Sequence, residues 1–166
     1  MERVSKNDYY LNIAEKVAER STCLNKHWGA VIVKDDVIIS TGFNGAPRHV
    51  KDCLEKGYCR LSEYRRKHGL GRGTAYEQCL SAHAEMNAII FGDKENMNGA
   101  TLYLCGVERL GLEDIWSYVA NPNPCPQCKK LIINAGIKDV IVKIGDKISA
   151  YFDVSDWDEE DIVGGY

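Results

Sequence analysis

The sequence predicts an α/β protein, a three-layer α/β/α sandwich around a central mixed sheet. Its predicted elements follow the order helix, β-hairpin, helix, strand, helix, strand within a chain of 166 residues. The last two strands, at 101–105 and 138–143, flank a helix, which requires a parallel, right-handed crossover. The apolar strands of the hairpin suit a sheet that helices cover on both faces. The length suits one hydrophobic core, so residues 1–166 are expected to form a single domain.

The first part of the chain is expected to supply one helix and the hairpin. Apolar residues recur at helical spacing between Asp8 and Arg20, and the side chain of Asp8 is suited to cap this helix. The continuous apolar run at 30–33 predicts a strand. After a turn at Asp35 and Asp36, residues 37–43 return as the second strand.

The middle of the chain combines an irregular segment with a second helix. Residues 46–80 form a polar, Cys-rich insert in which residues 61–67 favour a short helix. Good helix formers then follow His83, with Ala84 and Ala88 at helical spacing. A helix that begins next to His83 is therefore predicted.

The last part of the chain adds the crossover unit and two segments without a predicted element. Residues 106–123 interrupt the path from the third strand to the next helix and are interpreted as an insertion. That helix is predicted from Cys125 to Ala135, with Gly136 closing it. Residues 145–166 are interpreted as an acidic C-terminal tail.

Composition narrows the class of protein. The formal net charge is −3, so no broad basic surface is expected and a nucleic-acid partner is disfavoured. No apolar run approaches the roughly 20 residues of a membrane span, and the N-terminal residues contain no signal-peptide core. A cytoplasmic protein without a membrane partner is therefore expected. The chain has seven cysteines, and in a reducing compartment these are better interpreted as metal ligands than as disulfides.

Two short segments carry the metal chemistry. His83 and Glu85 stand at the start of one predicted helix, and Cys125 and Cys128 stand at the start of another. Residues two apart point to nearly opposite sides of a helix, because one turn holds about 3.6 residues, so the site must lie beyond the helix ends. The positive ends of both helices favour thiolates there. His83, Cys125 and Cys128 are thus predicted to bind a catalytic zinc with an open position for water, with Glu85 as a non-ligating acid.

A closed, structural zinc site is the alternative interpretation. It would need a fourth protein ligand, for which Glu85 and Cys105 are the candidates. Cys105 qualifies because it ends a strand that is expected to run alongside the metal. The chain would then be a non-catalytic, zinc-stabilised binding module.

These motifs resemble the cytidine deaminase superfamily of zinc-dependent enzymes, and more closely its deoxycytidylate (dCMP) deaminases. The resemblance rests on the segments Arg20–Cys23, Gly29–Val33, Gly42–Gly45, His83–Ile89, Pro124–Cys128 and Ala135–Ile137. It implies a cytidine deaminase-like fold, zinc ligands at His83, Cys125 and Cys128, and a proton shuttle at Glu85. It also implies that Asn44 hydrogen-bonds the sugar and base of a nucleotide. Finally, it indicates a homo-oligomer, from dimer to hexamer, and a dNTP effector.

The reaction implied is hydrolytic deamination of a cytosine nucleotide, with dCMP converted to dUMP and ammonia. Zinc lowers the pKa of bound water to around 7, and Glu85 would carry protons to ring N3 and to the leaving amine. The same chemistry on cytosine, guanine, a pterin-like ring or tRNA adenosine is the alternative. The acidic balance of the chain speaks against tRNA.

Four residues are expected to face the substrate. They are Asn44, Ala84, Lys26 and Arg48. Lys26 and Arg48 are the cations in the segments that resemble the family's substrate-facing loops. Arg48 suits a phosphate because a guanidinium can make two parallel hydrogen bonds, although a plain surface charge fits it equally well. Residues 65–67 are interpreted as a solvated helix face.

A second, structural zinc is predicted in the Cys-rich part of the chain. A loop of about 30 residues with little regular structure is uncommon in a compact domain, and a metal would explain its order. The expected ligands are Cys23, Cys53, Cys59 and Cys79, with His49 as a substitute for one of them. Some dCMP deaminases similarly carry a structural zinc held from these regions. The alternative is four separate reduced thiols.

Overall fold

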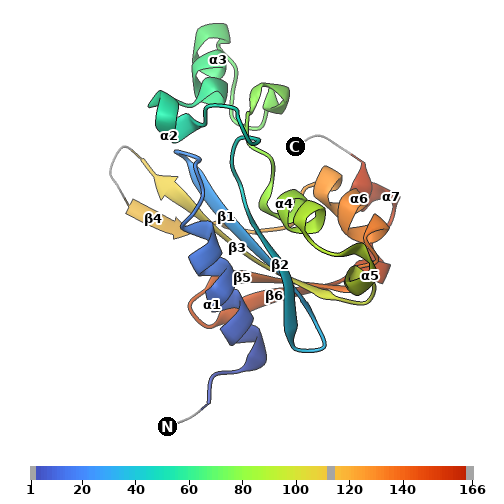
Figure 1. Cartoon of the computed structure of the whole chain (residues 1–166). Coiled ribbons are helices and arrows are strands. Elements are labelled where there is room, and N and C mark those ends of the chain that lie inside the picture. The colour runs from blue at the N-terminus through green and yellow to red at the C-terminus, as the bar shows by residue number, and fades with distance from the viewer. Residues whose placement is uncertain (1–2, 112–114, 164–166) are drawn as a thin grey trace.

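The computed structural model describes residues 3–111 and 115–163, which form a mixed six-stranded sheet with helices on both faces (Figure 1). The sheet order is β2-β1-β3-β5-β6, and β4 pairs with one end of β3. The strands are β1 (Lys26–Lys34), β2 (Val37–Phe43), β3 (Thr101–Leu110), β4 (Ile115–Tyr118), β5 (Asp139–Gly145) and β6 (Ile148–Asp153). β3 and β5 are parallel and flank a helix, as the crossover predicts.

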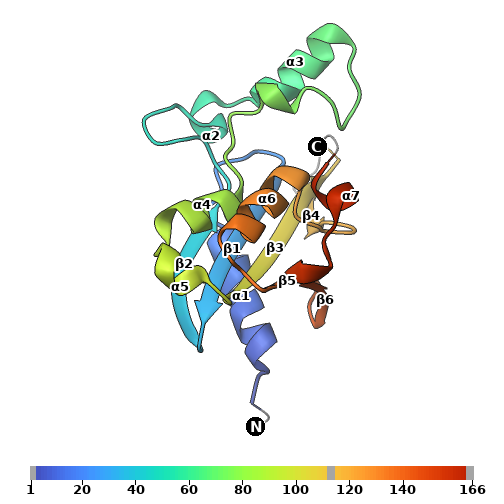
Figure 2. The ribbon, with the colours of Figure 1, turned by 90° about the vertical axis from the view of Figure 1, so that its right-hand side faces the viewer.

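Helix α1 (Lys6–Ala18) covers one face of the sheet, and helices α4 (Ala84–Phe91) and α6 (Pro126–Asn134) lie together on the other (Figure 2). The remaining helical segments, of which α3 (Arg60–His68) is the longest, lie at the edges or beyond the end of the sheet. The others are α2 (Cys53–Lys56), η1 (Tyr76–Gln78), α5 (Lys94–Met97), η2 (Val154–Asp156) and α7 (Glu159–Ile162). Among the described residues, no helix combines the length and the apolar character that crossing a membrane requires.

The two layers are built by alternation along the central strands. Ile32 and Leu104 point to the core beneath α4 and α6, whereas Val31 and Cys105 point to the core beneath α1. Successive side chains of a strand point to opposite faces, so one apolar run serves both cores. This confirms the predicted three-layer sandwich.

Glycines allow the helices to approach the sheet closely. A Cβ atom on Gly29 would lie 2.1 Å from the Ala14 carbonyl oxygen of α1. A Cβ atom on Gly42 would lie 2.3 Å from the Ala84 carbonyl oxygen of α4. Such distances are far below a van der Waals contact, so any side chain at Gly42 would displace the first turn of α4 and the residues that it positions.

Several predicted boundaries need correction. Helix α1 begins at Lys6 and is capped by Ser5, whose hydroxyl accepts from the backbone N–H of Asp8 at 3.1 Å, so Asp8 is not its cap. The sequence predicts that helices cover both faces of β2. In the structure β2 is an edge strand, and several of its residues are exposed. Its outer residues include Val37, which is exposed.

The segments 106–123 and 145–166 contain regular structure that the sequence did not predict. β3 continues to Leu110, and β4 pairs back onto it, with Val107 opposite Tyr118. Further on, β6 pairs with β5, and α7 is tied to α6 by an ion pair between Lys129 and Asp161. The described part of 145–166 is therefore folded onto the sheet and α6, where an acidic tail was expected.

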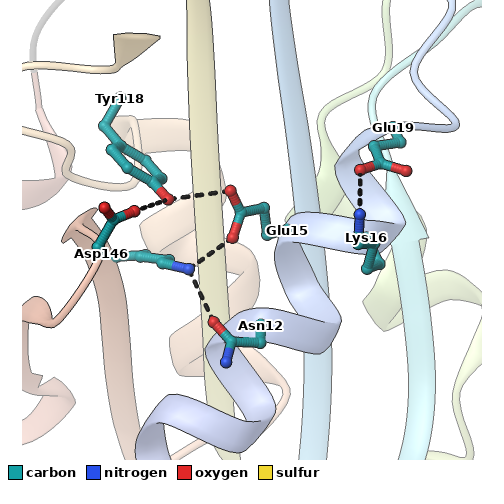
Figure 3. Close-up of polar contacts among 7 residues, drawn as sticks. Asn12, Glu15, Lys16, Glu19, Tyr118 and Asp146 are labelled. Atoms are coloured by element: carbon teal, nitrogen blue, oxygen red, sulfur yellow. Dashed lines mark hydrogen bonds and ion pairs between the residues drawn. The ribbon is translucent and has the colours of Figure 1, made fainter.

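A polar network connects α1 to β4 and β5 (Figure 3). The buried Lys143 of β5 donates to Asn12 Oδ1 at 2.8 Å and to Glu15 Oε2 at 2.5 Å. The Tyr118 hydroxyl lies 2.9 Å from Glu15 Oε1 and 3.2 Å from Asp146 Oδ1. The network thus joins α1, β4 and β5 on the face opposite α4 and α6.

Candidate active site

Two helix starts meet on the α4/α6 face of the sheet. His83 is the residue preceding α4, and Cys125 is the residue preceding α6. Glu85 and Cys128 lie in the first turns of these helices, and Pro126 occupies the first turn of α6, where its missing N–H leaves no backbone donor unpaired. This is the arrangement that the spacing predicts, with the side chains gathered beyond and around two positive helix ends.

The three predicted zinc ligands are brought together. The His83 Nδ1 atom lies 3.4 Å from Cys125 Sγ and 3.3 Å from Cys128 Sγ. Ligand atoms of the three residues all lie within 4.8 Å of one another. Tetrahedral zinc with bond lengths of about 2.3 Å to sulfur and 2.0–2.1 Å to nitrogen places such ligands about 3.5 Å apart. The donor set therefore fits a zinc ion in type and in spacing.

In the absence of metal, the thiol of Cys125 ionises more readily than the thiol of Cys128. A hydrogen bond from Cys128, supported by His83, lowers the pKa of Cys125 to about 4. The thiolate of Cys125 and burial in turn raise the pKa of Cys128. One thiolate and one thiol thus stand side by side, and zinc would release the remaining proton because it binds thiolates.

Glu85 is buried next to the metal-binding group but is not part of it. Its side chain is 5% exposed, and burial raises the pKa of its carboxyl above the ordinary value, with the nearby His83 opposing that shift. Among the described residues, the group that could hold a metal consists of His83, Cys125 and Cys128. A carboxyl with a raised pKa beside an open metal position is suited to exchange protons near neutral pH.

Cys105 is excluded as a fourth ligand. It points into the α1 core with Tyr103 and Val31, on the opposite face of the sheet from His83. It is fully buried, and burial raises the pKa of its thiol to about 12. The interpretation of a closed site completed by Cys105 is therefore wrong, because the residue projects to the wrong side of its strand.

A cavity of about 270 Å³ opens over the metal-binding group. Its walls come from the loop before β1, the end of β2, the starts of α4 and α6, and the segment 46–80. Asn44, Ala84 and Lys26, three of the four residues expected to face the substrate, line it together with His83 and Glu85. Sites for small ligands are usually concave pockets of this kind, with a few convergent polar groups.

Asn44 is held rigidly at the wall of this cavity. Its Oδ1 accepts from the Trp28 backbone N–H at 2.7 Å, and its Nδ2 donates to the Lys26 carbonyl oxygen at 3.0 Å. An amide side chain offers two donors and two lone pairs, so one of each remains for a ligand. The side chain is buried, which fixes the direction in which these groups are presented.

The structure does not bring Arg48 to the cavity. Its guanidinium lies 4.6 Å from the ring centroid of Phe91, at the opposite end of α4 from His83. Eight helical residues extend about 12 Å at 1.5 Å per residue, so the two ends of α4 are well separated. The expectation that Arg48 faces the substrate is corrected accordingly.

Arg65 is the cation that the sequence analysis missed. It lines the cavity from α3, although the sequence predicts a solvated helix face at residues 65–67. The signal was present in the spacing, because Arg65 follows the buried Leu61 by four residues and so shares its helix face. Arg66 does lie exposed, paired with Glu63 at 3.0 Å.

The four cysteines proposed for a second metal line one small cavity beside the first. They are Cys23, Cys53, Cys59 and Cys79, all present as free thiols. Burial, followed by the neighbouring Cys59, raises the pKa of Cys53 to about 11. Among the described residues, no three of these sulfur atoms lie within 4.8 Å of one another, so a shared metal would require them to close in. His49 is exposed and does not line this cavity.

Comparison with known proteins supplies the family context. Residues 4–144 match the family described as the cytidine and deoxycytidylate deaminase zinc-binding region. The deoxycytidylate deaminase of Mycobacterium phage D29 is 32% identical over 147 residues, which cover 85% of this chain and 96% of that protein. The deoxycytidylate deaminase of Saccharomyces cerevisiae is 30% identical over 140 residues, and the match covers 84% of this chain but 38% of the yeast protein.

Solved structures show the same fold. The dCMP deaminase of cyanophage S-TIM5 in its apo form superposes with a TM-score of 0.54 at 22% identity, over 86% of this chain and 85% of that one. Its complex with dCMP and dUMP gives a TM-score of 0.52. At 22% identity these structures support the fold, and the roles of individual residues rest on the geometry of the site.

Proposed function

The chain belongs to the cytidine and deoxycytidylate deaminase family, and from this premise we propose that it hydrolyses dCMP to dUMP and ammonia with zinc as cofactor. The observation that carries the proposal is the convergence of His83, Cys125 and Cys128 beside a buried, non-ligating Glu85 at the base of one cavity. Three protein ligands with an open position are typical of a catalytic zinc site. One water is consumed and one ammonia released for each dCMP.

The proposed roles of the residues follow from their positions. Zinc bound by His83, Cys125 and Cys128 would lower the pKa of its water to about 7. The carboxylate of Glu85 accepts a proton from the attacking water and delivers it to ring N3. It then takes the proton of the new C4 hydroxyl and passes it to the amine, so that the C4–N bond breaks, ammonia leaves and the C4 carbonyl forms. The burial of Glu85 keeps bulk water from competing for these protons. Asn44 presents its remaining donor and acceptor to the sugar and base.

The nucleotide preference is a prediction that a substrate panel tests. We expect dCMP to be turned over faster than deoxycytidine and faster than cytosine. Charged hydrogen bonds to the phosphate contribute about 1.5–3 kcal/mol, or roughly 10- to 150-fold in kcat/KM between dCMP and deoxycytidine. Ammonia release from each compound, measured with the zinc-loaded protein, gives the comparison.

Two results of the panel would contradict the proposal. If cytosine, guanine, a pterin or tRNA adenosine is the best substrate, the dCMP assignment fails and the zinc deaminase class remains. If no member of the panel releases ammonia while zinc is bound, the chain is a zinc-stabilised binding module.

We also propose a structural zinc bound by Cys23, Cys53, Cys59 and Cys79. Support comes from the common cavity that the four thiols line and from the thiolate character of closed zinc sites. The expected result is two zinc ions per purified chain, falling to one in the variant Cys53→Ser with the catalytic metal retained. One zinc in the wild-type chain, together with four thiols that alkylate freely in the native state, would contradict this proposal.

We propose that the chain acts as one deaminase domain in which segment 46–80 forms a wall of the cavity. Homo-oligomer formation, from dimer to hexamer, a dNTP effector and a cytoplasmic location stay predictions. The exposed Ile90 and Phe91 on α4 offer apolar surface for subunit contact.

A further inference from the structure

Helix α3 places one arginine over the substrate cavity. The helix stands beyond the end of the sheet, next to α2 (Figures 1 and 2). Its Leu61 is buried, and Arg65 lies one turn further on the same face. Both residues line the cavity whose base contains His83 and Glu85. Arg65 and the metal-binding group therefore address the same space from different elements.

The guanidinium of Arg65 is already oriented. Its Nε and one terminal nitrogen donate to the Thr74 carbonyl oxygen at 2.8 Å and 2.5 Å. The group also lies 4.8 Å from the ring centroid of Tyr76. A guanidinium has five N–H bonds, so three remain available to a ligand. Because the backbone carbonyl and the ring restrict the side chain, less entropy is lost when an anion binds.

Arg65 differs from Lys26 in having no carboxylate partner among the described residues that would neutralise its charge. Both cations line the cavity, but Lys26 forms an ion pair with Glu108 at 3.1 Å. Within residues 3–111 and 115–163, Arg65 has no carboxylate at ion-pair distance. An oriented guanidinium without a carboxylate partner is complementary to a phosphate, which accepts paired N–H donors.

We propose that Arg65 binds the 5′-phosphate of the substrate and thereby makes the enzyme prefer a nucleotide to a nucleoside. The inference rests on the proposed deamination of dCMP and assigns the phosphate to a residue of segment 46–80. The phosphate then lies against the α3 wall while the base reaches Glu85 and the metal. Segment 46–80 is, on this account, the part of the chain that selects the substrate.

The variant Arg65→Gln tests the assignment. It is expected to lower kcat/KM for dCMP roughly 10- to 150-fold, mainly through KM, because the phosphate is bound equally in the ground and transition states. Turnover of deoxycytidine is expected to stay at the wild-type rate, which also shows that the variant is folded. The matched control is Arg66→Gln, which alters the exposed neighbour of Arg65. This variant should leave kcat/KM unchanged for both dCMP and deoxycytidine.

A binding measurement separates the inference from the proposed reaction. Titration calorimetry should show that Arg65→Gln weakens the binding of dUMP by a similar factor and leaves the affinity for deoxyuridine unchanged. Equal losses on nucleotide and nucleoside would show that Arg65 only supports the wall, and would overturn the assignment. Wild-type preference for dCMP that survives in Arg65→Gln would also overturn it, while the proposed function would stand. A wild-type enzyme that binds and converts deoxycytidine as well as dCMP would overturn the assignment and the nucleotide preference, whereas a zinc-loaded enzyme that forms no dUMP from dCMP would refute the proposed function.

Discussion

Replacing Glu85 with Gln is expected to lower dCMP deamination by about 10²–10⁴-fold while the zinc content stays unchanged. Glutamine keeps the size of the buried side chain but cannot carry a proton from water to N3 and the amine. Glu85 lies outside the set of residues whose ligand atoms converge, so the metal should remain. Ammonia release and metal analysis of the same preparation provide the measurement.

The control for this variant is Glu77→Gln. Glu77 lies exposed on η1, outside the cavity lining, so its replacement should affect neither activity nor metal. If Glu85→Gln releases the zinc, Glu85 is a ligand and the site is closed. If it retains full activity, another group carries the protons.

Replacing Cys128 with Ser is expected to remove zinc and activity together. A serine hydroxyl is a harder and weaker zinc ligand than a thiolate. Cys128 is fully buried in the first turn of α6, and among the described residues only His83 and Cys125 share its metal-binding group. Metal content and ammonia release should fall in parallel, and added zinc should not restore turnover.

Cys105→Ala is the matched control for the cysteine variant. Cys105 is equally buried but faces α1, so its loss should leave zinc and turnover in place at a modest cost in stability. Zinc loss from Cys105→Ala would contradict the open site. Full zinc retention in Cys128→Ser would mean that the metal is held by other residues.

The convergence of His83, Cys125 and Cys128 was predictable because each half of the site is formed by residues close together in the sequence. His83 and Cys125 precede helices whose starts are visible in the sequence, and Cys128 follows Cys125 by one helical turn. The two halves meet because two successive parallel crossovers, β2-α4-β3 and β3-α6-β5, place α4 and α6 on the same face of the sheet. Local spacing and connectivity together were sufficient.

The faces of individual elements were harder to predict. Cys105 and Leu104 are neighbours in an apolar strand, and only the packed structure shows which of them points to α1. Arg48 and Arg65 differ likewise, because the direction of the loop after β2 and of α3 depends on tertiary contacts. β6 escaped prediction because it lacks a continuous apolar run, and all six of its residues are half-buried or exposed.

The most direct test of the account is the conversion of dCMP by the chain stripped of metal and then supplied with zinc. We expect no dUMP from the stripped protein, and equal amounts of dUMP and ammonia once zinc occupies the site formed by His83, Cys125 and Cys128. Zinc bound at this site without any dUMP formed from dCMP would contradict the account.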